Sequence, residues 1–185
     1  MDDDRLKYIV ESMLRHGLVK FGEFTLTSGI KSAYYIDLRP VPSIPRLFRL
    51  IVEGLLEISP VDECDGFVGI ATGGIPLACY MAVLTNKPMA YVRRERKEHG
   101  EMKIVEGFVK NLRVIIVDDV ATTGSSIASA INVIRSEGGE PILAVVVVDR
   151  EQGARSRIEG MGVPFKSLMK ASTILNYTKC FNTHC

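Results

Sequence analysis

Three short apolar runs constrain the fold of this chain more than any other feature of its sequence. They span residues 66–71, 114–117 and 142–148, and the last is the richest in β-branched side chains. Between them lie segments whose apolar residues recur at helical spacing. Strands that are apolar along their whole length are buried on both faces, so helices must cover both sides of the sheet. The pattern therefore predicts an α/β fold around a mostly parallel sheet.

Further elements continue this alternation. Apolar residues predict a helix over 6–13, a second helix that begins at Pro45, and a third that ends near Gly138. Residues 32–39 and 88–93 have the character of strands. Ligands bind at the carboxyl ends of the strands in sheets of this kind, so the loops that follow the strands are the first places to look for chemistry.

Composition narrows the class of protein. The 185 residues carry 23 basic and 22 acidic side chains, and a net charge of +1 provides no uniform field for nucleic acid or an anionic membrane. With 46% hydrophobic residues the chain is not disordered, and no apolar run is long enough to cross a bilayer. We expect a single domain over 1–185, with 176–185 as an appendage, and neither nucleic acid nor a membrane as partner.

The cysteines and the acidic N-terminus favour a cytoplasmic protein. Residues 1–4 lack the basic and apolar pattern of a signal peptide, and no Cys-x-x-Cys pair occurs. The thiols of the four cysteines are therefore expected to be reduced. Cys180, His184 and Cys185 could instead be metal ligands, but terminal residues are usually loose and a fourth ligand is not evident.

The loop after the 114–117 run has the strongest chemical character. Asp118 and Asp119 end the run, and Thr122, Thr123, Gly124, Ser125 and Ser126 lead into the next helix. A helix N-terminus offers free N–H groups and a positive dipole to a phosphate, the hydroxyls add donors, and the glycine admits a close approach. The carboxylates would repel a phosphate and suit sugar hydroxyls. One loop would thus hold a phosphate at one end and a ribose at the other.

Two other interpretations of this loop are helix capping and a nucleotide triphosphatase site. Thr and Ser are common helix caps, but capping explains one or two of these residues and neither carboxylate. An apolar strand that ends in two aspartates also occurs in nucleotide triphosphatases. That class needs a phosphate loop with a Gly-Lys pair, and the chain contains no such pair.

Two more loops and one arginine are candidates with open alternatives. Residues 71–74 form either a second anion site or an ordinary glycine-rich turn. Residues 93–101 form either a solvated hairpin or a source of cationic donors for a leaving diphosphate, because five basic side chains fall within 93–99. Arg150, at the end of the 142–148 run, is either a surface arginine or a bidentate partner for a ligand carboxylate.

At this point the sequence resembles a known family. Residues 114–126 (Val-Ile-Ile-Val-Asp-Asp-Val-Ala-Thr-Thr-Gly-Ser-Ser) are similar to the phosphoribosyl pyrophosphate (PRPP) motif of the type I phosphoribosyltransferases. Residues 20–29, 32–37, 93–100 and the pair Asp149-Arg150 resemble segments of the orotate phosphoribosyltransferases. The resemblance covers about residues 5–170. It implies transfer of ribose 5-phosphate from PRPP to orotate in pyrimidine synthesis, with Mg²⁺ bound mainly through PRPP and with no direct protein ligand assigned.

The resemblance also implies a particular architecture. The fold would be a five-stranded, mostly parallel sheet with helices on both faces and a small N-terminal hood, largely from 18–40. Residues 93–107 would form a mobile lid that reaches the active site of the neighbouring subunit in a homodimer. Catalysis would need orientation of two substrates and stabilisation of the departing diphosphate, without a covalent protein nucleophile.

Site residues follow from the resemblance residue by residue. Lys97, His99, Asp118 and Asp119 would be catalytic, Thr72 and Gly73 would form the pyrophosphate loop, and Thr122 and Arg150 would bind orotate. The residues expected to bind PRPP are Arg93, Arg94, Lys97, His99, Asp118, Asp119, Val120, Ala121, Thr122, Thr123, Gly124, Ser125 and Ser126.

The chain departs from the family pattern at two positions, and two rival functions stay open. Some members carry lysine at the positions of Thr27 and Gly73, and the sequence does not reveal what replaces these charges. A transferase for another base is disfavoured because Arg150 would lack a carboxylate partner. A PRPP-sensing regulator would need a DNA-binding element or a basic face, and the near-neutral chain has neither.

Overall fold

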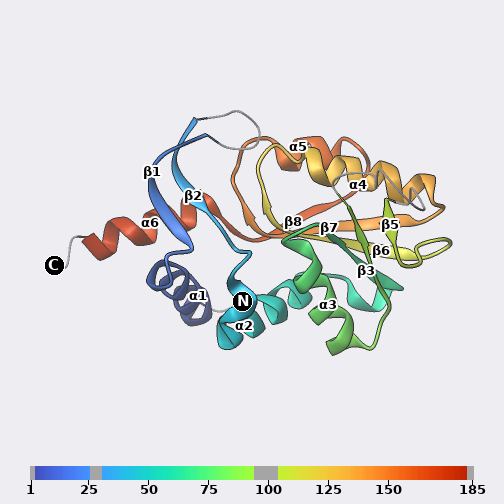
Figure 1. Cartoon of the computed structure of the whole chain (residues 1–185), viewed down its shortest axis with the longest axis horizontal. Coiled ribbons are helices and arrows are strands. Elements are labelled where there is room, and N and C mark those ends of the chain that lie inside the picture. Colours follow the sequence, from blue (N-terminus) through green and yellow to red (C-terminus); the bar gives the residue numbers. More distant parts are fainter. Residues whose placement is uncertain (1–2, 26–30, 94–103, 183–185) are drawn as a thin grey trace, which may run out of the picture.

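The computed structural model describes residues 3–25, 31–93 and 104–182, and the elements lie in an α/β arrangement (Figure 1). In chain order they are α1 (Asp3–Arg15), β1 (Val19–Thr25), β2 (Lys31–Ile36), η1 (Val41–Ser43), α2 (Pro45–Glu57), η2 (Val61–Glu63), β3 (Gly66–Ile70), α3 (Gly74–Thr85), β4 (Met89–Val92), β5 (Val105–Glu106), β6 (Arg113–Ala121), α4 (Ser125–Ser136), β7 (Glu140–Asp149), α5 (Ala154–Glu159), β8 (Phe165–Lys170) and α6 (Ala171–Asn182).

The main sheet has the strand order β5-β4-β3-β6-β7-β8, and all pairs are parallel except β4 with β5. The prediction of a mostly parallel sheet is confirmed, but the predicted count of five strands is wrong by one. The two-residue strand β5 pairs antiparallel with β4, with Val105 opposite Val92. A two-residue strand is too short to produce a recognisable apolar periodicity in the sequence. It also lies inside the lid predicted over 93–107, and its residue Val105 is buried.

Helices cover both faces of the sheet, as expected (Figure 1). Alternate residues of the central strands point to opposite sides because the side-chain period of a strand is two. Ile115 and Val145 belong to a core shared with α1, α2 and α3, whereas Ile116 and Val146 belong to a core shared with α4 and α5. The continuous apolar runs are thus explained by burial on both faces.

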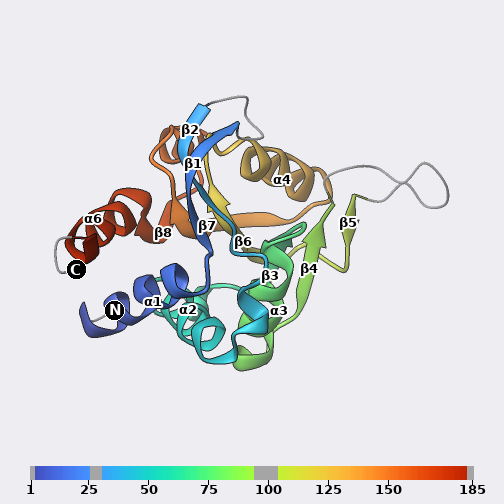
Figure 2. The ribbon, with the colours of Figure 1, turned by 60° about the vertical axis from the view of Figure 1, so that its left-hand side comes forward.

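The hood predicted from the N-terminal segment is a separate two-stranded antiparallel sheet of β1 and β2. It stands beside the main sheet, whose edges are β5 on one side and β8 on the other (Figure 2). The strand expected over 32–39 ends earlier, since β2 stops at Ile36 and a turn at Arg39 and Pro40 follows. The name hood is kept below for β1 and β2.

Two further boundaries differ from the predictions. Strand β6 continues past the apolar run to Ala121, because its backbone stays paired with the long strand β7. The acidic pair therefore lies within the strand and not in the loop after it. At the C-terminus, residues 176–182 form the second half of α6, whose first turn is anchored by the buried residues Ala171 and Ile174. No helix in the described parts of the chain is both long and apolar enough to span a membrane.

Candidate active site

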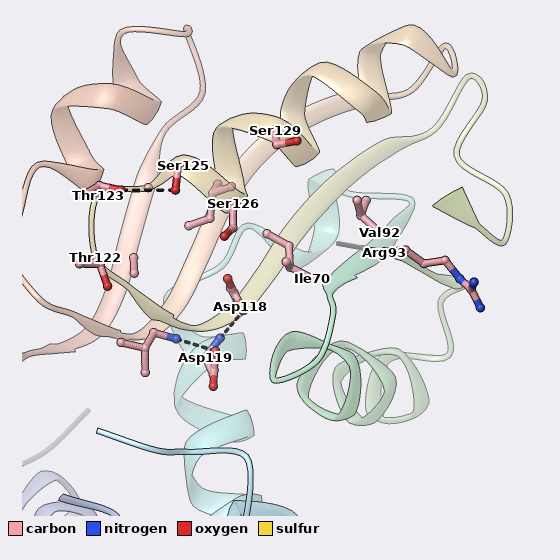
Figure 3. A pocket seen from close by; sticks show the side chains of 14 residues that line it. Ile70, Val92, Arg93, Asp118, Asp119, Thr122, Thr123, Ser125, Ser126 and Ser129 are labelled. Atoms are coloured by element: carbon pink, nitrogen blue, oxygen red, sulfur yellow. Dashed lines mark hydrogen bonds between the residues drawn. The ribbon is translucent and has the colours of Figure 1, made fainter. Parts of the chain in front are cut away.

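A cavity of about 420 Å³ opens at the carboxyl ends of the central strands (Figure 3). The ends of β3 and β4 contribute Ile70, Val92 and Arg93. Strand β6 and the start of α4 contribute residues 118–127 and Ser129. All of the PRPP-binding residues predicted within 118–126 therefore line one cavity, at the place where parallel sheets bind ligands.

Asp118 and Asp119 point to opposite sides of β6 (Figure 3). The carboxylate of Asp118 accepts the backbone N–H of Asp119 at 2.9 Å, and that of Asp119 accepts the N–H of Val120 at 2.9 Å. These bonds fix both side chains against their own strand. Asp118 is buried, with 7% exposed, and Asp119 is half-buried. The two carboxylates thus offer acceptors on two sides of one strand, which suits a ligand with several hydroxyls.

The N-terminus of α4 faces the same cavity. Its N-cap is Gly124 in the left-handed conformation, with φ +74°, and no side chain caps this helix end. Ala154 lies 3.0 Å from where a Cβ on Gly124 would stand, so this position needs glycine for both conformation and space. The capping interpretation of the Thr and Ser residues is therefore wrong. The first N–H groups of the helix have no partner within it and are available to an anion.

Hydroxyl groups surround that helix end. Thr123 lies 3.4 Å from Ser125 between hydroxyl oxygens, and Thr122 and Ser126 also line the cavity (Figure 3). Ser125 and Ser126 are exposed, whereas both threonines are half-buried. The hydroxyls and the free N–H groups together form a set of donors that matches the oxygens of a phosphate group.

The loop that holds Thr72 and Gly73 joins β3 to α3 and packs against the acidic pair. A Cβ on Gly73 would lie 2.2 Å from the carboxylate of Asp119, and one on Gly74 would lie 2.2 Å from the carbonyl oxygen of Val117. Both positions therefore require glycine because the loop approaches β6 closely. The Ala71–Thr72 peptide bond is cis. The structure thus brings the predicted pyrophosphate loop directly beside Asp119.

Arg93 lies at the rim of the cavity, and its side chain points away from the β6–α4 loop (Figure 3). Its Nε atom is 3.1 Å from a carboxylate oxygen of Glu106 on β5. Arg93, which is predicted to bind PRPP, is thus paired with Glu106 in this structure. Arg94, Lys97 and His99 lie outside the described residues, as does Thr27.

Arg150 is not one of the lining residues given above, and its side chain reaches toward the hood. Its backbone N–H donates to the carbonyl of Ala121 at 2.9 Å, which places it beside Thr122. Its Nη2 atom donates to the hydroxyl of Ser32 at 2.8 Å, and its guanidinium lies over the ring of Tyr34, 4.3 Å from the centroid. Arg150 is 4% exposed. The alternative of a surface arginine is therefore wrong.

Another charged group near the site, which the sequence did not predict, is the Asp37–Arg39 pair that follows the hood. The guanidinium of Arg39 donates to both carboxylate oxygens of Asp37, at 2.7 and 2.8 Å. These bonds hold the pKa of Asp37 below its ordinary value. They also raise the pKa of Arg39, to which the negative charge of Asp119 adds a smaller contribution. The positive charge of Arg39 is thus within electrostatic reach of the cavity. No spacing in the sequence indicates this pairing.

Within residues 3–25, 31–93 and 104–182, no group of three or more His, Cys, Asp and Glu residues is placed to hold a metal ion. Cys64 and Cys79 are free thiols. His184 and Cys185 lie outside the described residues, so the alternative of a metal site at the tail is not tested.

Comparisons with known proteins agree with this geometry. The model of the phosphoribosyl transferase domain family matches residues 48–163. The orotate phosphoribosyltransferase of Sulfolobus acidocaldarius is 43% identical over 167 residues, which are 90% of this chain and 85% of that protein. The crystal structure of the Aeropyrum pernix orotate phosphoribosyltransferase superposes with a TM-score of 0.84 and 39% identity, over 92% of this chain and 98% of that one.

A third similar protein was solved with a ligand. The Mycobacterium tuberculosis orotate phosphoribosyltransferase in complex with PRPP has a TM-score of 0.73 and 29% identity, over 92% of this chain and 98% of that one. The sequence, the parallel sheet and the cavity at its carboxyl edge therefore lead to one assignment: this chain belongs to the phosphoribosyl transferase domain family and, within it, to the orotate phosphoribosyltransferases.

Proposed function

We propose that this chain transfers the ribose 5-phosphate group from PRPP to N1 of orotate. The products are orotidine 5′-phosphate and diphosphate, and the reaction is a step in the synthesis of pyrimidine nucleotides. The observation that carries the proposal is the cavity in which an uncapped helix N-terminus, a set of hydroxyls and two carboxylates meet. Arg150 is buried, and its backbone N–H is bonded to Ala121, which lines this cavity beside Thr122.

The cavity can hold PRPP in one orientation. The N-terminus of α4 and the side chains of Thr122–Ser126 bind the 5-phosphate, because they provide donors and a positive dipole. Asp118 and Asp119 accept hydrogen bonds from the ribose hydroxyls. The loop at Thr72 and Gly73 then faces the diphosphate, which leaves toward the rim where Arg93 lies.

The chemistry requires little of the protein beyond positioning and electrostatics. The C1–diphosphate bond breaks, the C1–N1 bond forms, and the ribose carries positive charge in the transition state. Nearby carboxylates stabilise that charge, and cations stabilise the departing diphosphate. We assign the second task to Arg93, Arg94, Lys97 and His99. Closure of the lid excludes water, which would otherwise compete with orotate for C1.

Mg²⁺ fits this site as a substrate-bound cofactor. It binds proteins through one or two carboxylates together with substrate phosphates. Asp118 and Asp119 each hold a backbone N–H with one carboxylate oxygen, and carboxylate oxygens are ligands that suit Mg²⁺. When bound, Mg²⁺ neutralises the charge of the diphosphate and makes it a better leaving group. The residues that would meet its coordinated waters are these two aspartates.

Arg150 and Thr122 select the base. Orotate carries a carboxylate, and a buried guanidinium is the group best suited to pair with it. A base without a carboxylate would leave Arg150 buried without an anionic partner, which disfavours a transferase for uracil or a purine.

We further propose a homodimer, and helix α3 supports it. None of its residues, Gly74–Thr85, is charged, and its outer side exposes Val83 by 70% and Leu84 by 47%. Phe108, in the loop after β5, is 89% exposed. An uncharged helix with exposed apolar side chains is a candidate surface for contact between subunits. A second copy of the chain is the occupant that a shared lid would require.

Mixing two inactive variants tests the shared lid. Lys97→Ala and Asp119→Asn subunits, each strongly impaired alone, should regain part of the activity after subunit exchange, because a mixed dimer contains one site with an intact lid and an intact acidic pair. Exchange confirmed by mass spectrometry without any recovery would contradict lid sharing.

A cytoplasmic location completes the proposal. The free thiols of Cys64 and Cys79 support it, since the cytoplasm keeps thiols reduced.

The direct test of the proposed function is an assay with PRPP, orotate and Mg²⁺. Orotate absorbance should fall as orotidine 5′-phosphate and diphosphate form in equal amounts. The matched control is the Asp118→Asn, Asp119→Asn double variant, which should keep the fold and lose the reaction. Absence of turnover in folded wild-type protein, with or without Mg²⁺, would contradict the proposal.

A further inference from the structure

The hydroxyl group of Ser32 in the hood uses its whole hydrogen-bonding capacity on two partners. It accepts from Nη2 of Arg150 at 2.8 Å and from the backbone N–H of Tyr34 at 3.2 Å, and it donates to the carbonyl of Tyr34 at 2.7 Å. A serine hydroxyl has one donor and two acceptor positions, so all three are filled. Ser32 therefore ties the guanidinium of Arg150 to the backbone of β2.

The remaining contacts of Arg150 restrict the same guanidinium further. The ring of Tyr34 covers one face at 4.3 Å, and Nη2 lies 3.4 Å from the carbonyl oxygen of Tyr34. At its other end the backbone is held by Ala121 on β6. An arginine side chain normally has many rotamers, and these contacts leave it few.

One donor of this restrained group has no partner. Nε of Arg150 is buried and makes no hydrogen bond within the described parts of the chain. An unpaired guanidinium N–H in a buried place is unfavourable, and a ligand acceptor would relieve it. The guanidinium therefore keeps unused donor capacity for an anionic ligand group while Ser32 holds Nη2.

We propose that Ser32 is a positioning residue for base recognition, which it serves by orienting Arg150 before the base binds. The proposal rests on the proposed function, because it takes the orotate carboxylate to be the group that Arg150 meets. Ser32 is half-buried and bonded to Arg150, and the phosphate-facing residues 122–126 lie on other elements. Its removal should therefore affect orotate and leave PRPP binding nearly unchanged.

Ser32→Ala should raise KM for orotate about tenfold, equivalent to about 1.4 kcal/mol, while KM for PRPP changes less than twofold. Ser32→Thr retains the hydroxyl and should restore most of the affinity, and Ser32→Cys, with a weak acceptor, should resemble Ser32→Ala. Ser59→Ala is the matched control. Ser59 is also half-buried, but its hydroxyl bonds to the carbonyl of Leu55 at 2.6 Å in α2. This variant should leave both KM values unchanged.

A double-mutant cycle separates positioning from a general structural role. If Ser32 acts through Arg150, Ser32→Ala should have no further effect on KM for orotate in an Arg150→Ala background. An equal effect in both backgrounds, or an unchanged KM for orotate in folded Ser32→Ala, would overturn the proposal. Failure of the wild-type protein to convert orotate would instead refute the proposed function, so the two failures are distinguishable.

Discussion

The β6–α4 loop and the contact between Arg150 and the hood are built in opposite ways. The end of β6, the loop and the start of α4 supply carboxylates, hydroxyls and free N–H groups from one contiguous stretch, 118–126. The contact joins residues 118 positions apart in the chain, from β2 and from the turn after β7. The first region is fixed wherever the main sheet is folded. The second also depends on the placement of a two-stranded sheet, which is marginally stable by itself.

This difference predicts separable effects on the two substrates. Changes in the contiguous loop should affect PRPP, and changes in the long-range contact should affect the base. The predictions below test this separation, from the largest expected effect to the smallest.

Loss of either carboxylate should have the largest effect. Asp118→Asn and Asp119→Asn should each lower kcat/KM for PRPP by about a hundredfold, because a charged acceptor of a hydrogen bond contributes on the order of 1.5–3 kcal/mol. The asparagine oxygen can still accept the backbone N–H that Asp118 or Asp119 now accepts, so the thermal unfolding temperature should change little. Normal PRPP affinity in both variants would show that the acidic pair does not face the ribose.

A variant that displaces the Asp119 carboxylate without removing it should have the second largest effect. Gly73→Ala places a Cβ 2.2 Å from that carboxylate, which must shift. A shift of this order in a positioning group costs up to about a hundredfold in rate, and we expect about thirtyfold in kcat/KM for PRPP.

Gly17→Ala is the control, because Gly17 has φ +65° and no atom within 4 Å of the added carbon. It should lower the free energy of unfolding by about 1 kcal/mol and leave kcat/KM unchanged. If Gly73→Ala and Gly17→Ala lowered kcat/KM equally, the loss in Gly73→Ala would be explained by reduced stability alone.

Single hydroxyls around the end of α4 should matter less. Thr122→Val and Ser126→Ala should each raise KM for PRPP about two- to tenfold, since one neutral hydrogen bond contributes a net 0.5–1.5 kcal/mol. Ser136→Ala, at the exposed far end of the same helix, is the matched control. No change of KM in either loop variant would mean that the backbone N–H groups hold the phosphate without them.

The smallest effect concerns the turn after Arg150. Glu151 accepts the N–H of Ser172 at 3.1 Å and lies 3.6 Å from Nζ of Lys170. The hydrogen bond from Ser172, aided by Lys170, lowers the pKa of Glu151. A lowered pKa in the folded state stabilises the protein above the ordinary carboxyl pKa, and this stabilisation is lost as the pH falls through the lowered value.

Glu151→Gln should therefore lower the free energy of unfolding by roughly 0.5 kcal/mol at neutral pH, a small value because the pair is solvent-screened. Urea unfolding should show the difference shrink in acid, where wild-type Glu151 is protonated. A difference that grows on acidification would contradict the assignment. KM for PRPP should be the same in both proteins.

The contrast between the two regions also explains what the sequence could reveal. The parallel sheet followed from the apolar runs, and the phosphate loop followed from adjacent residues whose spacing is local. The edge strand β5 is too short to leave a pattern, and Asp118 and Asp119 are strand residues because β7 extends the pairing. The residues alone left Arg150 open between a surface arginine and a ligand partner, since its burial depends on Ser32 and Tyr34 in a distant segment. The charge of Arg39 near Asp119 arises in the same long-range way.

The central claim is that Arg150, held by the hood, recognises the carboxylate of the base. It is tested most directly by the ratio of kcat/KM for orotate to kcat/KM for uracil, measured in the wild type and in Arg150→Ala. Because a charge-assisted pair contributes about 1.5–3 kcal/mol, the ratio should be large in the wild type and fall about ten- to a hundredfold in the variant, with KM for PRPP nearly constant. An unchanged ratio, which means an equal loss of kcat/KM for both bases, would contradict the claim.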